Sequence, residues 1–357
     1  MSREHILYNF GAGPAMLPAE VVEATAEAVK NFNGTGLSLM EIGHRTSAFK
    51  AVLAEAQQLM RELLNIPSHF AVLFLGGGAR LQFDMVPMNF LRSKAQYVDS
   101  GHWAHQAMES ARLWGEVVCN EAGAVYDHWP ELPTIDCGAD YLHLTTNNTI
   151  YGTELRTDLD SPIPVVADMS SDILTRPIDF TNYGMIYGGA QKNLSMAGVT
   201  FVIVNKEWVG HAGRKLPPML DYAVHVAHES MYNTPPMLPI YTALQTLHWV
   251  KAQGGVEEMG RRAKQRAHLL YAEIERNSLF RCTAKADRSL MNCCFVLNEP
   301  YQYLQEAFVN FAQAHGIYAI QGHRLVGGFR ASLYNAMPIE GVQALVDCMR
   351  AFETEAK

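Results

Sequence analysis

Two stretches, PVVAD at residues 164–168 and GMIYGGAQKN at residues 184–193, decide the fold of this chain. Each contains an unbroken apolar run, which is typical of a strand covered on both faces in a parallel sheet. The first run ends at Asp168, and the second leads through small residues to Lys192. Because adjacent parallel strands joined by a crossover end on the same edge of a sheet, we expect these two side chains to lie close together.

The flanking sequence continues this alternation of strands and helices. Continuous apolar runs predict further strands, and apolar residues at helical spacing predict helices. The predicted strands cover residues 71–75, 96–98, 141–144 and 199–204, and the predicted helices cover residues 19–31, 47–64 and 235–251. Polar residues follow the runs, at the strand ends where open α/β sheets bind ligands. The sequence therefore indicates an α/β fold with a mostly parallel sheet wrapped in helices.

The C-terminal third has a different order of elements. Gly254 and Gly255 interrupt the pattern, and a helix rich in charged residues follows at residues 256–277. Further strands are predicted at residues 291–297 and 328–333, and further helices at residues 301–315 and 339–352. We predict a large domain at residues 15–255, and a smaller α+β domain that combines residues 256–357 with the N-terminal segment 1–14.

Composition argues against several classes of protein. The chain has 357 residues, of which 48% are hydrophobic, enough to bury a large core. Its net charge of −8 comes without a run of like charges, which argues against nucleic acid or an anionic membrane as a partner. No apolar run approaches the roughly 20 residues that cross a bilayer, and the N-terminus does not resemble a signal peptide, so we expect a cytoplasmic location. The six cysteines form no CxxC pair, so we expect reduced thiols and no metal site.

Lys192 is the strongest candidate for chemistry. A lysine directly after a strand, in a loop of small residues, can be held against a planar cofactor, and partial desolvation makes its neutral amine available as a nucleophile. An ordinary exposed lysine in a Gly-rich turn is the alternative from this segment alone. Asp168 shifts the balance, because a carboxylate on the same sheet edge can pair with the protonated pyridine nitrogen of pyridoxal phosphate (PLP). Asp168 could instead cap the turn that contains Ser170 and Ser171.

A glycine-rich turn and several cationic side chains extend the candidate site. GGGAR at residues 76–80 follows a predicted strand, so its backbone N–H groups could hold a phosphate at a helix start, although a simple tight turn would have the same sequence. Trp103, also just past a strand, is either a stacking partner for a cofactor ring or a core residue. The residues that could bind anionic groups of a substrate, each of which alone would pass for an exposed charge, are His44, Arg45, His323, Arg324 and Arg330.

Together these residues resemble the phosphoserine aminotransferase family, in the class V branch of the fold-type I PLP-dependent transferases. The resemblance extends over nearly the whole chain. Its most specific segments are GPAMLP at 13–18, Met40-Glu41 before His44-Arg45, GAQKN at 189–193, NTPP at 233–236, GHRLVGG at 322–328 and YNAMP at 334–338. The combination of the last two segments distinguishes this family from other class V aminotransferases.

The resemblance implies how PLP would be held. Lys192 would be the Schiff-base lysine, Asp168 would pair with the pyridinium, and Trp103 would stack on the ring, with Thr149 near the ring hydroxyl. Further contacts to the cofactor and its phosphate would come from Ala79, Arg80 and Gln191, and from Asn233 and Thr234 of a neighbouring subunit. An obligate homodimer with shared active sites follows from this pattern.

The resemblance also implies the substrates. Glutamate would donate its amino group to 3-phosphohydroxypyruvate, giving 2-oxoglutarate and O-phosphoserine in serine biosynthesis, and the four-carbon analogue used in pyridoxine biosynthesis would be open to the same enzyme. Arg330 would bind the α-carboxylate. The remaining substrate anions would bind to His323 and Arg324, and to His44 and Arg45 across the dimer.

Two rival interpretations and two departures from the family pattern stay open at this point. Another class V aminotransferase or lyase could act on a different small acidic amino acid, but a desulfurase needs a reactive cysteine on a loop, whereas Cys293 and Cys294 lie within a predicted strand. A non-catalytic binding protein on the same fold would not need both Lys192 and Asp168. The departures are Gly11-Ala12, where relatives often carry serine, and Leu81, where glycine is common.

Overall fold

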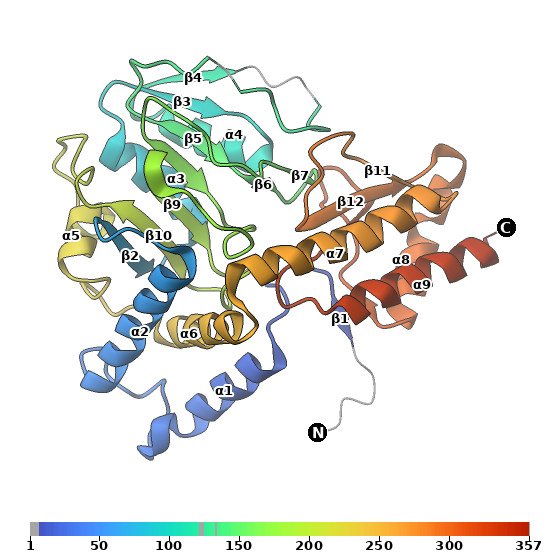
Figure 1. The fold of residues 1–357 in the computed structure, drawn as a ribbon, viewed down its shortest axis with the longest axis horizontal. Coiled ribbons are helices and arrows are strands. Elements are labelled where there is room, and N and C mark those ends of the chain that lie inside the picture. Colours follow the sequence, from blue (N-terminus) through green and yellow to red (C-terminus); the bar gives the residue numbers. More distant parts are fainter. Residues whose placement is uncertain (1–6, 121–124, 133, 357) are drawn as a thin grey trace.

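A computed structural model describes residues 7–120, 125–132 and 134–356, and its centre is a seven-stranded sheet (Figure 1). The strand order is β2-β10-β9-β8-β5-β3-β4. These strands are β2 (Phe70–Leu75), β3 (Lys94–Val98), β4 (Glu116–Asn120), β5 (Leu142–Thr145), β8 (Val165–Asp168), β9 (Tyr183–Gly189) and β10 (Thr200–Asn205). β8 pairs in parallel with β9, and Asp168 lies opposite Tyr187. The carboxyl ends of these two strands therefore lie side by side, as the sequence predicts.

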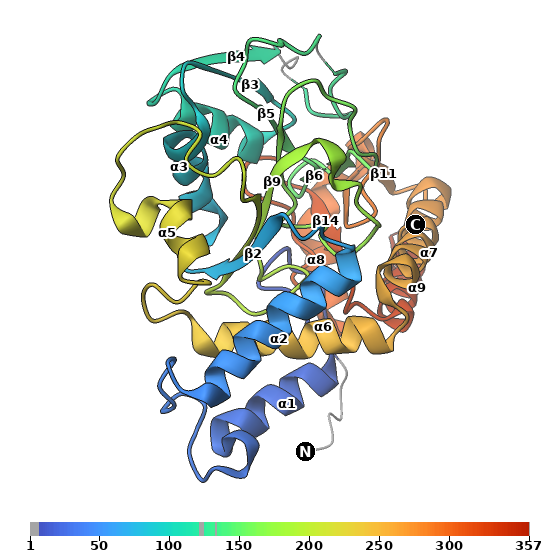
Figure 2. The ribbon, with the colours of Figure 1, turned by 60° about the vertical axis from the view of Figure 1, so that its left-hand side comes forward.

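Side chains of the sheet alternate between two layers of helices. On β2, Val72 and Phe74 pack with one layer, and Leu73 and Leu75 pack with the other. The first layer consists of α1 (Ala19–Lys30), α2 (Ser47–Leu64) and α6 (Met237–Ala252), and the second of α3 (Gly78–Phe90), α4 (His102–Ala111) and α5 (Tyr222–Ala227). Figure 2 shows α1, α2 and α6 gathered below the sheet. The predicted α/β fold with a mostly parallel, helix-covered sheet is confirmed.

Two strands of the sheet depart from the sequence-based expectation. β10 runs antiparallel to both of its neighbours, β2 and β9. The polar residues that follow β10 therefore lie at the sheet edge opposite Asp168, and the expectation that they join the ligand-binding edge is wrong. The sequence pattern also misses β4, an edge strand whose sequence EVVCN offers only a short apolar run.

The C-terminal part builds a separate core on a three-stranded antiparallel sheet of β11 (Phe280–Cys282), β12 (Asn292–Leu297) and β14 (Phe329–Ser332). The helices of this part are α7 (Gly255–Arg276), α8 (Gln305–Ala314) and α9 (Ile339–Glu355). The predicted helix at residues 301–315 is partly wrong, because a 3-10 helix (Glu299–Leu304) with Pro300 near its start precedes α8. Near the N-terminus, β1 (Tyr8–Asn9) pairs with β13 (Ile317–Tyr318), and Phe10 packs in the same core. The domain boundaries stay a prediction.

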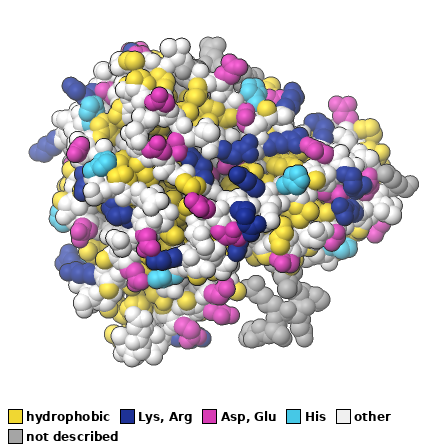
Figure 3. Space-filling view, viewed as in Figure 1, with side chains coloured by type: hydrophobic (Ala, Val, Ile, Leu, Met, Phe, Trp, Pro, Cys, Tyr) yellow, Lys and Arg dark blue, Asp and Glu magenta, His cyan; other side chains and the backbone are white. Residues whose placement is uncertain are grey.

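The remaining connections and the surface matter less for the site. A short hairpin of β6 (Asn147–Asn148) and β7 (Thr153–Glu154) follows β5. Over the face drawn in Figure 3, acidic and basic side chains are interspersed, with Lys and Arg gathered near its middle. Across the described residues, the structure contains no helix whose length and apolar character would let it cross a membrane.

Candidate active site

A cavity of about 310 Å³ opens at the carboxyl edge of the large sheet, where β5, β8 and β9 end and where α3 and α4 begin. Asp168 and Lys192 both line it, so the structure brings together the two residues on which the sequence argument depends. The full lining is Gly77, Gly78, Ala79, Arg80, Phe83, Trp103, Thr145, Asn147, Asp168, Ser170, Ser171, Gln191 and Lys192.

Asp168 is the buried carboxylate of this cavity, with 5% of its surface exposed. Its Oδ1 accepts hydrogen bonds from the backbone N and the Oγ of Ser170, at 2.9 and 2.5 Å. Among the described residues, every hydrogen bond to the carboxylate ends on Oδ1. Burial raises the pKa of Asp168, and the Lys192 amine and the Ser170 hydrogen bonds offset this only in part. One oxygen therefore caps the turn, and the other is left for a cation in the cavity.

Lys192 lies in the turn after β9, beneath the N-terminal segment of the chain. The backbone N of Ala15 donates to the carbonyl of Gln191 at 3.0 Å, and a Cβ added to Gly13 would lie 3.4 Å from Cγ of Lys192. Burial lowers the pKa of the Lys192 amine, an effect that Asp168 opposes and Arg330 reinforces. A lowered pKa favours the neutral amine, which is the form that attacks a carbonyl carbon.

Close packing of β9 on the turn after β8 fixes Asp168 and the Lys192 turn relative to each other. A Cβ on Gly188 would lie 2.5 Å from the Phe201 ring and 2.7 Å from Cα of Ser170. Only glycine at position 188 therefore allows the backbone of β9 to approach Phe201 and the turn at Ser170 so closely. The amide of Gly189 also donates to Oγ of Ser170 at 3.0 Å, so this one hydroxyl connects both catalytic segments.

The glycine-rich turn forms the start of α3 and can receive an anion. Gly77 caps the helix with a φ of 98°, a conformation that glycine adopts without strain. The residues that follow, Ala79 and Arg80, are in the first turn of the helix and line the cavity, where unpaired amides favour a phosphate. Leu81 folds back so far that its Cδ2 would lie 2.3 Å from a Cβ on Gly77. The departure at Leu81 thus leaves the helix start intact but requires glycine at position 77.

Trp103 reaches the cavity from the first turn of α4. Its indole Nε1 donates to Oγ1 of Thr149 at 3.2 Å, and the guanidinium of Arg80 lies 5.4 Å from the ring centre. The hydrogen bond to Thr149 and the cation–π contact with Arg80 of α3 thus hold the indole in place. Thr149 stands behind Trp103 and does not line the cavity, so its own approach to a cofactor stays a prediction.

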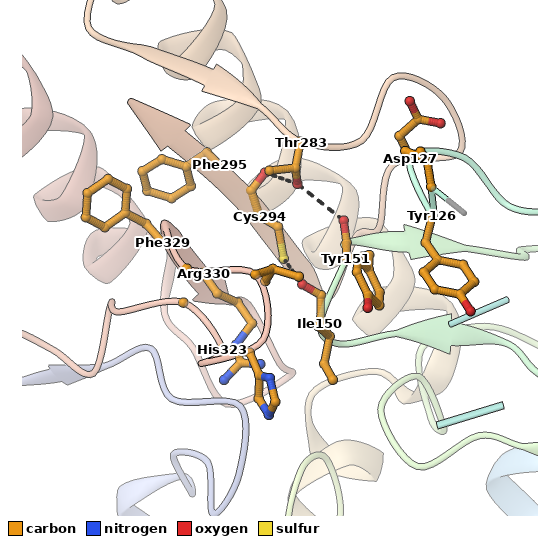
Figure 4. A pocket seen from close by; sticks show the side chains of 14 residues that line it. Tyr126, Asp127, Ile150, Tyr151, Thr283, Cys294, Phe295, His323, Phe329 and Arg330 are labelled. Atoms are coloured by element: carbon orange, nitrogen blue, oxygen red, sulfur yellow. Dashed lines mark hydrogen bonds between the residues drawn. The ribbon is translucent and has the colours of Figure 1, made fainter. Parts of the chain in front are cut away.

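A second cavity, of about 240 Å³, lies between the segment at residues 150–151 and the small sheet, and it contains His323 and Arg330 (Figure 4). The two side chains lie close to each other in the lower middle of the view, and Phe295 and Phe329 lie above and to the left of them. Nη1 of Arg330 donates to the carbonyl of Thr149 at 3.0 Å, but Nε is buried without a partner among the described residues. Arg330 therefore keeps a donor free for an anion.

The other predicted substrate and cofactor residues lie outside both cavities. His44 and Arg45 belong to the loop before α2, and Asn233 and Thr234 belong to an exposed loop before α6. Arg324 is exposed beside His323 and helps to lower the pKa of that imidazole, after burial and Arg330. A single chain does not bring His44, Arg45, Asn233 and Thr234 to Lys192, so their roles stay predictions.

The cavity also contains residues that sequence reasoning missed. Thr145 ends β5 opposite Asp168, and its Oγ1 is buried without a hydrogen-bond partner in the described part of the chain. Asn147 donates from Nδ2 to Oγ of Ser171 at 2.8 Å. Both follow a predicted strand at the ligand-binding edge. Their position after a strand could have identified them as ligand-binding candidates. Thr and Asn are common in ordinary turns, however, so the residue types alone did not indicate a site.

The cavity fits a planar aromatic phosphate ester such as PLP. The free Oδ2 of Asp168 suits a protonated ring nitrogen, and the Trp103 indole offers a face for stacking. The start of α3 suits the phosphate, and Lys192 offers the amine that the cofactor's aldehyde requires. The unpaired hydroxyl of Thr145 supplies a further polar contact beside the ring nitrogen's partner.

Comparison with known proteins gives consistent matches over nearly the whole chain. The family model described as aminotransferase class V matches residues 7–345. A phosphoserine aminotransferase of Phocaeicola vulgatus is 59% identical over 350 residues, which cover 97% of this chain and 98% of that protein. The solved phosphoserine aminotransferase of Bacillus circulans subsp. alkalophilus superposes with a TM-score of 0.94 at 40% identity, covering 98% and 99% of the two chains. The PLP-bound enzyme of Trichomonas vaginalis gives a TM-score of 0.91 at 34% identity, covering 96% and 99%.

Proposed function

The chain belongs to the class V aminotransferase family, and we propose that it transfers an amino group from glutamate to 3-phosphohydroxypyruvate, giving 2-oxoglutarate and O-phosphoserine. It is a PLP-dependent aminotransferase. The observation that carries the proposal is the meeting of Lys192 and Asp168 in one cavity, with His323 and Arg330 lining a second one. The high identity to phosphoserine aminotransferases supports the choice of substrates. A cytoplasmic location, as the sequence predicts, is part of the proposal.

Three side chains of the two cavities, Asp168, Lys192 and Arg330, have defined tasks in this reaction. When bound, PLP supplies the electron sink that lets the substrate's Cα lose a proton. Asp168 holds a proton on the ring nitrogen, because its buried carboxylate has one oxygen free for that contact. Nζ of Lys192, once neutral, moves a proton between the substrate's Cα and the cofactor's C4′. Arg330 orients the substrate through its α-carboxylate, using the donor that the protein leaves unpaired.

The decisive experiment compares two amino donors that differ only in the phosphate. Purified protein is mixed with 2-oxoglutarate and either phosphoserine or serine, and glutamate formation is measured. We expect rapid glutamate formation from phosphoserine and little from serine. A visible absorption band that borohydride removes would distinguish a PLP enzyme from a non-catalytic binding protein. Equal rates with the two donors would contradict the proposed substrate and leave an aminotransferase of another specificity.

A desulfurase-type lyase is the alternative that the structure weakens most directly. Cys293 and Cys294 lie inside β12 and are buried. Burial raises the pKa of the Cys294 thiol to about 12 and that of Cys293 well above its ordinary value. A desulfurase needs an accessible thiolate near neutral pH, and these two cysteines do not provide one.

We also propose that the active enzyme is a homodimer in which His44, Arg45, Asn233 and Thr234 complete the neighbouring site. Arg45, Asn233 and Thr234 are exposed in one chain and His44 is half-buried, which supports this arrangement, since exposed polar residues are available to a second copy. Subunits carrying Lys192→Ala are co-expressed with subunits carrying Arg45→Ala, each with its own tag. If Arg45 crosses the interface, half of the sites in mixed dimers are intact, and a statistical mixture recovers about a quarter of wild-type activity.

The matched control uses two residues of one cavity. Pairing Lys192→Ala with Asp168→Asn should recover little activity, because an intact site needs both residues from the same chain. Absence of recovery with Arg45→Ala as well would contradict the shared site, provided that mixed dimers are isolated through both tags.

A further inference from the structure

We infer that His102 is a specificity-determining residue that binds the substrate's phosphate together with His323, an inference that rests on the proposed function. His102 is the first residue of α4, directly before Trp103. Its ring centre lies 5.0 Å from that of Trp103 and 6.4 Å from that of His323. The His102 ring therefore lies near the neighbouring indole and also near an imidazole from a segment far away in the sequence.

The charged groups around His102 are mainly positive. Arg80 of α3 and Arg324 of the loop at residues 321–328 both lower its pKa, after burial, and His105 of its own helix adds to their effect. His105 differs from the arginines because it has an acidic partner: its Nδ1 lies 3.1 Å from Oδ2 of Asp99. Neither His102, His323 nor the arginines beside them form an ion pair with a carboxylate of the described residues. Asp127 lines the same cavity as His323, but its carboxylate pairs with Lys285 and His128. An anionic group of a ligand would therefore be favoured here.

The surroundings of His323 lead to the same conclusion. Burial lowers its pKa, and so do Arg330, His102 and Arg324. Arg330, the predicted partner of the α-carboxylate, and His102 therefore both lie near enough to His323 to act on its charge. Phosphoserine bound through its α-carboxylate at Arg330 would direct its phosphate toward the two imidazoles. Their centres are too far apart for a direct hydrogen bond, so a phosphate that contacts both imidazoles would link two rings that do not bond to each other.

This placement makes recognition of the phosphate depend on pH. A phosphate between the imidazoles stabilises their protonated forms and raises their pKa on binding. Affinity gained in this way is present while the bound imidazoles are protonated, and it is lost as pH rises through their bound-state pKa. Glutamate has a carboxylate on a side chain of different length and no phosphate, so its half-reaction should depend less on His102.

The test is His102→Gln in the PLP-loaded enzyme, with each amino donor measured separately in half-reactions from about pH 6 to about pH 8. Near pH 6 we expect kcat/KM for phosphoserine to fall about 10-fold or more, as for loss of a charge-assisted hydrogen bond, and the loss should shrink toward pH 8. The glutamate half-reaction should stay within about twofold, which also shows that the variant folds and binds PLP. The ionisation of phosphoserine itself cancels, because variant and wild type are compared at each pH.

His315→Gln is the matched control, since it makes the same replacement at the exposed end of α8, and it should change neither donor. A second readout is calorimetric proton uptake when inorganic phosphate binds to the PLP-loaded enzyme, and His102→Gln should reduce it. Equal losses for phosphoserine and glutamate, or an unchanged pH profile for phosphoserine, would overturn the role of His102. Failure of the wild-type enzyme to convert phosphoserine would instead contradict the proposed function.

Discussion

The interior behind the cavity and the mouth in front of it carry opposite unbalanced charges. At the wall of the cavity, burial raises the pKa of Asp168, and behind it burial raises the pKa of Asp172 to about 6 and that of Glu154 to about 7. At the mouth, burial and nearby arginines lower the pKa of His102 and His323. We refer to these two regions as the acidic interior and the cationic mouth.

The difference shows what each region lacks when the protein chain is considered alone. In the acidic interior, Arg176 acts on Asp172 and Glu154, and Lys192 acts on Asp168, but these cations offset the effect of burial only in part. The protonated pyridine ring of PLP would provide a further cation beside Asp168. The cationic mouth lacks anions, which a substrate with a carboxylate and a phosphate would provide. Chemistry is therefore concentrated in the buried region and substrate choice in the more exposed one, and substitutions in the two regions should fail in different ways.

The largest effect is expected for Lys192→Ala in the interior. The change removes the nucleophilic amine and the proton carrier but only one half-buried side chain, so we expect transamination to be lost while the fold persists. Single-turnover assays with each donor measure the loss, and the thermal melting curve controls for folding. Retention of more than a small percentage of turnover would mean that another group carries the proton.

Asp168→Asn should have the next largest effect. A neutral amide no longer holds the ring nitrogen protonated, so we expect kcat to fall by orders of magnitude for every donor, while PLP still binds through Lys192 and the start of α3. The measurement is kcat beside the absorption band of bound PLP. Near-normal kcat would show that the only task of Asp168 is to cap the turn at Ser170.

The sequence predicted the interior better than the mouth, and the reason is physical. Asp168 and Lys192 follow apolar runs whose burial dictates strands, and parallel pairing places both strand ends on one edge. The direction of β10 could not be predicted in this way, because an apolar run carries no information on strand polarity. Likewise, nothing in the residues around His102 indicates that its ring lies near His323, since that placement depends on how the loop at residues 321–328 lies relative to the start of α4.

Substitutions in the mouth should separate the two anionic groups of the substrate. Arg324→Leu should weaken phosphoserine more than glutamate, by roughly 10- to 150-fold in kcat/KM, because a charge-assisted arginine to phosphate contact contributes on the order of 1.5–3 kcal/mol. Arg330→Leu should impair both donors alike, since both carry an α-carboxylate. Half-reaction kinetics with each donor make the comparison. Equal losses for both donors in Arg324→Leu would contradict its place in a phosphate site.

The smallest effect on turnover, but a clear one on stability, is expected for Glu154→Gln in the acidic interior. Glu154 is 5% exposed, and its Oε2 accepts a hydrogen bond from the backbone N of Leu290 at 2.7 Å, which an amide oxygen can also accept. Burial, reinforced by Asp172, raises its pKa from an ordinary 4.5 to about 7. The folded protein therefore binds this proton more tightly than the unfolded chain, so Glu154 costs nothing below about pH 4.5. Its cost in the free energy of unfolding grows as pH rises toward 7, up to about 3 kcal/mol.

Glu154→Gln removes that cost, so the variant should melt at a higher temperature than the wild type near pH 8 and at a similar one near pH 5. Thermal unfolding at the two pH values measures the difference, and Glu23→Gln, on the exposed face of α1, is the matched control that should show none. If Glu154→Gln were instead destabilising by the same amount at both pH values, the carboxylate would be needed for the Leu290 contact itself. The interior would then owe its negative charge to Asp168 and Asp172 alone, and the contrast with the mouth would be confined to the immediate surroundings of the cavity.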